Sequence, residues 1–236
     1  MALSQGAGAF FAMKSKQLLI ALACLATVAV CGVWTWRTQF AAPKFNVPLH
    51  VGLGHVMAEE TARALTNSGK IVIVTLDAHA FPDLGVQLAE FKKTVARHPQ
   101  LTIKEIYNLE TDDKPKYRFG SGLSARRYVR LVNKNVSAEA IVSFVGAPEL
   151  TDKDLAEMKK VPKLIAECRS AEKLKRMFES RALHTAVVGR FEYPTPVKGT
   201  PRTPREWVEQ RFQIVTSENT SSLPSGNDDL QPPPTK

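Results

Sequence analysis

The pattern of apolar residues divides the chain into one long uncharged run near the N-terminus and a following region of shorter runs. Residues 17–36 contain no charged side chain, and three cations bracket them: Lys14, Lys16 and Arg37. At about 1.5 Å per residue, a run of this length can cross a hydrocarbon core roughly 30 Å thick. Trp34 and Trp36 end the run, where aromatic rings favour the headgroup level. The pattern predicts a transmembrane helix over residues 17–36.

A cleaved signal peptide is the alternative interpretation of this run. Its apolar part would be about 7–15 residues long, whereas this run is longer and the two tryptophans stand where cleavage would fall. We therefore expect an uncleaved signal anchor. Residues 13–16 (Met-Lys-Ser-Lys) are typical of a bacterial start, so the chain begins at either Met1 or Met13. A short segment such as residues 1–16 usually stays inside, which predicts a single-pass protein of the bacterial inner membrane with its C-terminal domain outside the cytoplasm.

Beyond a linker at residues 37–49, two kinds of apolar pattern alternate up to residue 216. Residues 71–76 form a continuous apolar run, as in parallel strands covered on both faces. Residues 101–109 are apolar at Leu101, Ile103 and then Ile106, which indicates a half-buried strand. Further strands are expected at 140–145, 164–168, 185–193 and 212–215. Helices are expected at 51–67, 83–97, 124–133, 152–160 and 171–180, and Thr203-Pro204-Arg205-Glu206 has the form of a capping box that opens a short helix.

Strands that alternate with helices of this length imply a parallel sheet with right-handed crossovers. We predict one α/β domain over residues 50–216, built as a three-layer, doubly wound parallel sheet. The flavodoxin-like strand order 2-1-3-4-5 is favoured, because its switch point leaves a ligand crevice beside strand one. Past Ser217 the chain is polar and ends in a run of prolines, which indicates a disordered tail over residues 217–236.

Charge and cysteine usage exclude several classes of function. The net charge is +9, yet acidic residues interrupt the basic ones and the aromatic residues are not interleaved with them, so nucleic acid is not an expected partner. The three cysteines, Cys24, Cys31 and Cys168, contain no CxxC pair. The sequence shows no P-loop, nucleophile elbow or HExxH motif. We expect no metal, no cofactor and no catalytic residue, and hence no enzyme.

Candidate ligand-binding residues follow from the rule that doubly wound folds bind ligands at the carboxyl ends of their strands. Asp77 and His79 follow the first strand, and in an extended segment they would share one face. Such a pair suits a metal or proton transfer, or else a loop that caps the next helix. Later strand ends add Gly146, Glu149 and Arg169. The neighbouring Cys168 would have an activated thiol if exposed, and an inert one if buried.

A glycine motif supplies the remaining candidates. Residues 120–125, Gly-Ser-Gly-Leu-Ser-Ala, match G-x-G-x-x-A. The dinucleotide fingerprint requires this motif directly after the first strand, whereas here it follows the second. We interpret it as a turn into a helix, where Ser121, Gly122 and the helix start, with Arg126 and Arg127, are candidates for holding an anionic group.

The region from Lys70 to about Tyr193 resembles one lobe of the type I periplasmic binding proteins, the solute receptors of ABC transporters. The resemblance rests on the opening strand at 71–76, the helix at 85–95, and residues 140–146 followed by Thr151-Asp152. It implies an extracytoplasmic, non-enzymatic binding domain. Those receptors close two lobes around a solute, and this chain has residues for one. We therefore expect a single lobe that binds a small solute or a partner protein, either a membrane protein or a second copy. The alternative is an accessory or scaffold subunit of a membrane complex.

Overall fold

The computed structural model describes residues 15–39, 45–109, 123–168, 174–190 and 201–223. The chain forms two compact units, residues 1–44 and residues 45–236. The described part of the first unit is the helix α1 (Ser15–Gln39). Within α1, the stretch Leu19–Arg37 has a mean hydropathy of 2.1, and its apolar side chains are exposed. This length and composition suit a membrane span, and they suit a signal sequence equally.

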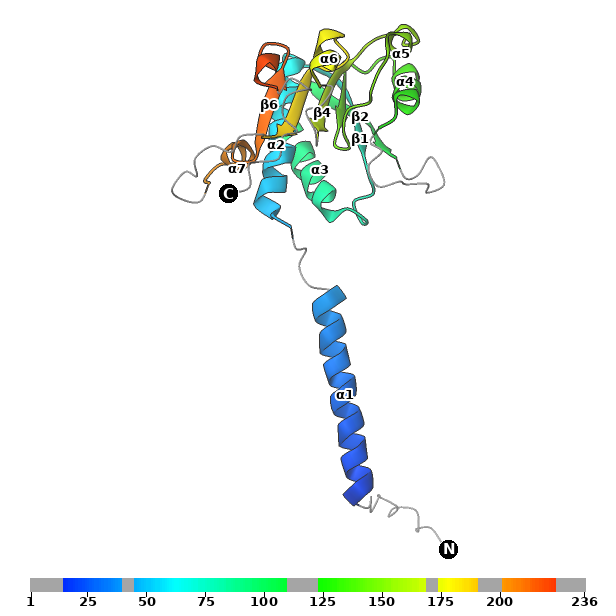
Figure 1. Cartoon of the computed structure of the whole chain (residues 1–236), viewed down its shortest axis with the longest axis vertical. Coiled ribbons are helices and arrows are strands. Elements are labelled where there is room, and N and C mark those ends of the chain that lie inside the picture. The colour runs from blue at the N-terminus through cyan, green and yellow to red at the C-terminus, as the bar shows by residue number, and fades with distance from the viewer. Residues whose placement is uncertain (1–14, 40–44, 110–122, 169–173, 191–200, 224–236) are drawn as a thin grey trace, which may run out of the picture. The chain divides into compact units, whose positions relative to one another are not determined.

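The second unit contains one six-stranded sheet, in the order β2-β1-β3-β4-β5-β6 (Figure 1). The first five strands are parallel, and β6 runs antiparallel beside β5. The predicted order 2-1-3-4-5 is therefore confirmed, with an antiparallel edge strand added. The strands are β1 (Gly69–Thr75), β2 (Leu101–Asn108), β3 (Ala140–Ser143), β4 (Lys163–Cys168), β5 (Thr185–Gly189) and β6 (Phe212–Thr216).

Helices cover both faces of this sheet, which confirms the three-layer architecture. One core cluster joins the sheet to α2, α3 and α7, with Met57, Phe91 and Val208 as buried examples. The other joins it to α4 and α6, with Tyr128 and Phe178 buried and α5 packed at its margin. The helices are α2 (Val47–Ala64), α3 (Pro82–Val95), α4 (Ala125–Lys134), α5 (Asp152–Ala156), α6 (Leu174–Glu179), α7 (Pro204–Glu209) and the 3-10 turn η1 (Thr220–Ser222).

Helix α2 begins at Val47, within the predicted linker, because the Asn46 side chain caps it by accepting a hydrogen bond from the Leu49 amide (3.3 Å). The helix leads into β1, and α3 follows β1. Both helices therefore start at the edge of the sheet where the parallel strands end, which we call the carboxyl edge. The side-chain contacts His50–Gln87 and His55–Thr94 confirm that α2 and α3 run parallel.

A β-bulge in β2 explains the irregular apolar spacing of that strand. Ile71 pairs with Ile103, but the next residue, Val72, pairs with Glu105, so Lys104 is the extra residue. The bulge places Ile103 and Ile106 on the same face, beside Ile71 and Ile73 of β1. Ile103 and Ile106 can therefore lie on one side of the strand although they are three residues apart.

Three predicted boundaries are corrected. Helix α5 ends at Ala156 rather than near residue 160, because Asn133 accepts a hydrogen bond from the Lys159 amide (2.9 Å) and donates one to the Glu157 carbonyl (3.0 Å). Strand β5 ends at Gly189, so Arg190 is not part of the predicted strand, and residues 191–193 lie outside the described residues. The ordered domain continues through residues 217–223, where Leu223 is buried in the core, so this part of the predicted tail is wrong. Residues 224–236 lie outside the described residues.

Candidate functional site

The sheet order places a switch point between β1 and β3, which lie side by side. From β1 the chain continues to β2 on one side, and from β3 it continues to β4 on the other. The loops after β1 (residues 76–81) and after β3 (residues 144–151) therefore begin side by side at the carboxyl edge and then lead to opposite sides of the sheet. Doubly wound folds bind ligands at such a point. The candidates Asp77, His79, Gly146 and Glu149 belong to these two loops.

Asp77 organises the loop after β1. Its Oδ1 accepts a hydrogen bond from the His79 amide (3.0 Å), and its carbonyl accepts one from the Phe81 amide (2.9 Å). The segment is thus a tight turn, and the expectation of an extended segment with both side chains on one face is wrong, because the carboxylate binds the local backbone instead. Asp77 is half-buried and the His79 side chain is exposed.

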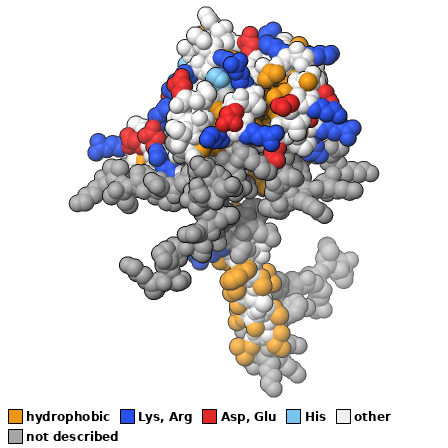
Figure 2. Space-filling view, turned by 45° about the horizontal axis from the view of Figure 1, so that its top comes forward, with side chains coloured by type: hydrophobic (Ala, Val, Ile, Leu, Met, Phe, Trp, Pro, Cys, Tyr) orange, Lys and Arg blue, Asp and Glu red, His pale blue; other side chains and the backbone are white. Residues whose placement is uncertain are grey.

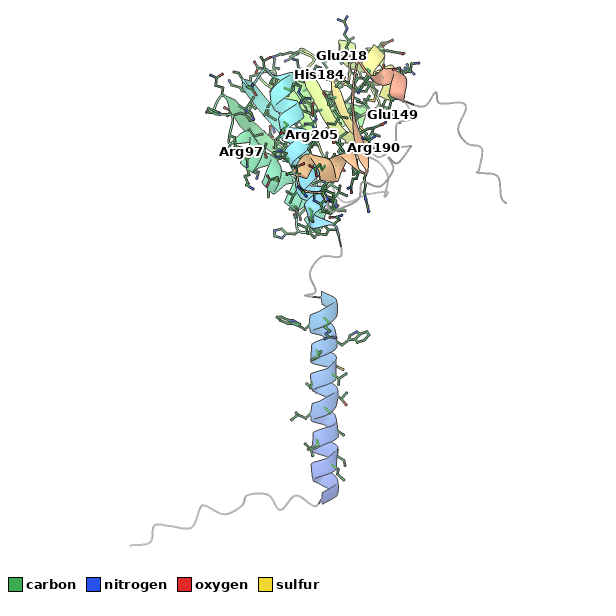
Figure 3. All side chains as sticks on the ribbon, turned by 90° about the vertical axis from the view of Figure 1, so that its left-hand side faces the viewer. Arg97, Glu149, His184, Arg190, Arg205 and Glu218 are labelled. Atoms are coloured by element: carbon green, nitrogen blue, oxygen red, sulfur yellow. The ribbon has the colours of Figure 1, made fainter. Side chains whose placement is uncertain are left out.

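The loop after β3 turns sharply over the end of its strand. The Ser143 hydroxyl donates to the Gly146 carbonyl (2.6 Å) and accepts from the Val145 amide (3.4 Å). Gly146 has a φ of +99°, a conformation that favours glycine, and no atom of the chain comes within 4 Å of where a Cβ would stand. The turn therefore leaves open space beside its backbone. Glu149, further along the loop, is exposed (Figure 3).

Cys168 ends β4 and lies in the core beneath this edge. Its side chain is 5% exposed. Burial raises the pKa of the thiol to about 12, the Glu167 charge adds to this, and a hydrogen bond with the Ala147 backbone opposes it. The thiol stays protonated at neutral pH and is a packing group rather than a nucleophile.

The remaining predicted candidates, Ser121, Gly122 and Arg169, lie outside the described residues, as do parts of the loops that follow β2, β4 and β5. The structure also places together a group that the sequence did not single out. Buried Glu60 of α2 accepts hydrogen bonds from Arg63 (2.6 Å and 2.8 Å) and from Arg205 of α7 (3.1 Å). Figure 3 shows Arg205 on α7. The only sequence signal for this contact is a helical acid 145 residues away from its arginine.

Two surface depressions are formed by described residues, and neither involves the loops after β1 and β3. One, of about 470 Å³, lies between α4 and α5. The other, of about 360 Å³, lies beside the ion pairs of Arg63 and Arg205. Within the described ranges, no three His, Cys, Asp or Glu side chains are arranged to hold a metal ion. Figure 2 shows basic and acidic side chains interspersed over the face in view, so no continuous basic surface covers that face.

Neither a protein-family profile nor a curated protein sequence matches the chain. Solved structures do. A solute-binding protein of an ABC transporter from Burkholderia graminis, in complex with D-arabinose, is similar with a TM-score of 0.50 at 18% identity, over 75% of this chain and 62% of that protein. The arabinose-binding protein AraP from Geobacillus stearothermophilus gives a TM-score of 0.51 at 14% identity, over 75% and 63%. A sugar-binding protein of a sugar ABC transporter from Bacillus halodurans gives 0.50 at 11%, over 74% and 64%.

These likenesses define the class of fold. The α/β unit has the fold of the periplasmic binding proteins, as its sequence pattern predicted. The match spans less than two thirds of the length of each of these three solute-binding proteins. The chain thus contains an α/β domain of this fold that follows one long apolar helix.

Proposed function

We propose that this protein is a membrane-anchored, extracytoplasmic binding domain of a single receptor-like lobe. Its ligand would contact the carboxyl edge at the switch point between β1 and β3. The observation that carries the proposal is the meeting of the two loops with Asp77 and Gly146 at this edge, on the fold of solute-binding proteins.

The two loops offer complementary means of contact. Gly146 exposes backbone with room beside it, as a close-fitting ligand requires. Asp77 and Glu149 offer carboxylate oxygens, which accept hydrogen bonds from hydroxyl or amide groups. Neutral, hydroxyl-rich solutes and the backbone of a partner protein both present such donors. We assign no catalytic role to these residues.

A single lobe favours a partner protein over a solute enclosed in a cleft. A lobe of this kind covers one side of a small ligand, and exclusion of water requires a second surface. A membrane protein or a second copy of this chain would supply it. The second candidate function, an accessory subunit that uses the same edge only for assembly, follows from the same observation.

The test uses the full chain in mild detergent and two measurements. Thermal melting with D-arabinose and other neutral sugars detects a solute, since a ligand at 100 times its Kd stabilises the folded state by about 2.7 kcal/mol. Purification from the native host detects a stoichiometric partner. Gly146→Val, which fills the open space, should abolish whichever interaction is found. Because a φ of +99° also strains any side chain at this position, the melting temperature of the ligand-free variant is measured beside it, and only a variant that melts cooperatively counts as a test. Glu218→Gln, a change at an exposed site after β6, should leave it intact.

Each outcome has a defined meaning. A sugar-dependent rise in melting temperature that Gly146→Val removes identifies a solute receptor. A partner that is lost in Gly146→Val but kept in Glu218→Gln identifies a docking domain. If no sugar raises the melting temperature and no partner depends on Gly146, the proposed site is wrong.

A further inference from the structure

A second site lies between the first halves of α4 and α5, on the face of the sheet opposite α2 and α3 (Figure 1). It is the depression of about 470 Å³, which we call the α4–α5 hollow. Its lining residues are Arg126, Val129, Arg130, Lys153, Asp154 and Glu157. The volume falls within the range of about 300–1,000 Å³ that is usual for small-molecule sites.

The cationic groups of the hollow form no close contact with an acid. Among the residues that the structure describes, the side chains of Arg126, Arg130 and Lys153 form no hydrogen bond and no ion pair. The pKa of Asp154 is nevertheless lowered by hydrogen bonds from Thr151 and, to a smaller extent, by the nearby charge of Lys153. Arg126 and Arg130 are four residues apart on α4, so their like charges face the same side of the helix. Lys153 of α5 brings a third positive charge to the same space.

The local structure of α4 makes this arrangement unfavourable in isolation. A helix N-terminus is its positive end and favours acidic residues in the first turn. The first turn of α4 contains no acidic residue and carries Arg126 instead, and the side chain of the N-cap residue Ser124 forms no capping hydrogen bond. Three local preferences are thus violated at one place, and an anion in the hollow would relieve all three. Such a concentration of conflicts is typical of a functional site.

The side chains that line the hollow also indicate the chemical groups of the anion. Guanidinium groups match the oxygens of a phosphate in a bidentate geometry. On the other side of the hollow, Asp154 is held by Thr151 through Oδ2 alone, with hydrogen bonds of 2.8 Å from the amide and 2.6 Å from the hydroxyl. Its Oδ1 and the Glu157 carboxylate can accept hydrogen bonds from hydroxyl groups. Val129 offers a small apolar contact.

We propose that the α4–α5 hollow binds a phosphate ester that carries hydroxyl groups. Arg126, Arg130 and Lys153 bind the phosphate, and Asp154 and Glu157 bind the hydroxyls. Two sources share this chemistry: a soluble sugar phosphate and the headgroup of an anionic lipid such as phosphatidylglycerol. The inference does not depend on the function proposed for the β1–β3 edge, which uses other residues.

The experiment measures binding to the full chain in two formats. In neutral detergent, calorimetric titration with glucose 6-phosphate, inorganic phosphate and glucose tests the soluble source. In nanodiscs of phosphatidylcholine with or without phosphatidylglycerol, protection of α4 from hydrogen exchange tests the lipid source. The variant Arg126→Gln/Arg130→Gln removes two exposed cations and should weaken binding at least tenfold. The matched control Lys92→Gln/Arg97→Gln removes the same charge from exposed positions on and after α3.

Binding of glucose 6-phosphate that is tighter than that of inorganic phosphate, and that only the α4 variant loses, supports a soluble ligand. Protection that requires phosphatidylglycerol and only the α4 variant loses supports the headgroup. Equal affinity for inorganic phosphate and glucose 6-phosphate overturns the assignment of hydroxyl groups. Binding that both double variants reduce alike, or no binding in either format, overturns the site. Melting temperatures that are no lower than that of the wild type verify that both variants retain the fold; the α4 variant is expected to melt slightly higher, because it removes the repulsion between two like charges.

Discussion

Gly54 lies at the closest approach of two helices. A Cβ at this position of α2 would collide with the backbone carbonyl oxygen of Gln87 on α3, and backbone cannot move aside as a flexible side chain can. Gly54→Ala should therefore lower the free energy of unfolding by about 2 kcal/mol, within the range for an overpacked core. Urea denaturation of the full chain in detergent, followed by tryptophan fluorescence, measures this. Gly189→Ala is the control, because nothing lies within 4 Å of its Cβ position; equal losses in both variants would contradict the packing argument.

Arg205 neutralises the buried carboxylate of Glu60. Glu60 is 2% exposed, and Arg205 also contacts Glu59 (3.0 Å) and Glu209 (3.1 Å). Arg205→Ala leaves Arg63 as the cation that pairs with Glu60, and should cost about 2 kcal/mol, as expected for lost hydrogen bonds to a charged group. The same denaturation assay measures the loss. Arg97→Ala, on the exposed surface (Figure 3), should change stability by less than about 0.5 kcal/mol.

Two histidines, half-buried His50 and exposed His184, make stability depend on pH. Burial lowers the pKa of His50 below its ordinary 6.5, although Asp83 opposes the shift. Burial and the charge of Lys163 likewise lower the pKa of His184. Below pH 6.5 these histidines bind protons more readily in the unfolded chain than in the folded chain. The free energy of unfolding is therefore highest above that pH and decreases as the pH falls.

Melting temperatures measured from about pH 7.5 to 5.5 should therefore decrease, and His184→Gln should flatten this decrease. His79→Gln, at an exposed position, provides the comparison. A wild-type melting temperature that rises as the pH is lowered through this window would mean that the folded state binds more protons than the unfolded state, and would contradict this prediction.

At the scale of elements, β6 is an edge strand whose outer side is closed by one side chain. Asn219 accepts a hydrogen bond from the Thr216 amide (2.7 Å) and donates one to the Ile214 carbonyl (3.0 Å). Ile214 and Thr216 are two apart, so these groups point to the same, outer side of the strand. The amide of Asn219 thus takes the place of a neighbouring strand, which is one way to protect an edge.

Asn219→Ala should reopen this edge. We expect a loss of about 1 kcal/mol, since water can replace part of the two hydrogen bonds at an exposed site, together with self-association at high concentration. Sedimentation velocity of the detergent-solubilised chain detects the association. Glu218→Ala changes the preceding exposed residue and should remain as dispersed as the wild type; association of both variants would rule out an edge-specific effect.

The sequence predicted most elements because their patterns are local. The continuous run at 71–76 is a buried strand, and Thr151 and Asp154 form a capping box at the start of α5. At the capping box predicted at Thr203, the hydroxyl accepts a hydrogen bond from the Glu206 amide (3.2 Å), and the Glu206 carboxylate accepts one from the Arg202 amide (2.7 Å) in addition to its interaction with Thr203. The role of Asn219 could not be predicted. Strands and helices are predicted from the repeated spacing of apolar residues, and a single asparagine in a polar segment belongs to no such pattern.

The candidate site was predictable only in outline. Strand order determines that the loops after β1 and β3 meet, and that order follows from the element pattern. The turn at Asp77 depends instead on which backbone amide its carboxylate reaches, and the open space at Gly146 depends on a positive φ. The α4–α5 hollow depends on side chains from two helices that sequence spacing does not relate.

For the whole molecule, the proposed anchor makes a direct prediction. Val28 is an exposed apolar residue in the middle part of α1. An arginine near the centre of a spanning helix disfavours insertion by about 2.5–3.5 kcal/mol. Val28→Arg should therefore release a large share of the protein into the soluble fraction on alkaline carbonate extraction, while Val28→Leu stays with the membranes. Equal extraction of both variants would argue against a span.

The point at which the chain enters the α/β domain has a mechanical consequence. Any tension transmitted along the chain from residues before Phe45 acts first on the start of α2, at the carboxyl edge. There the Phe45 ring meets His50 edge-on at 5.2 Å, and His50 lies 2.9 Å from Gln87 of α3. Helix α3 begins directly after the loop that Asp77 organises. A pull on the chain would thus act on the carboxyl edge before it acted on the rest of the sheet, so tension and the ligand proposed for that edge would affect the same few contacts.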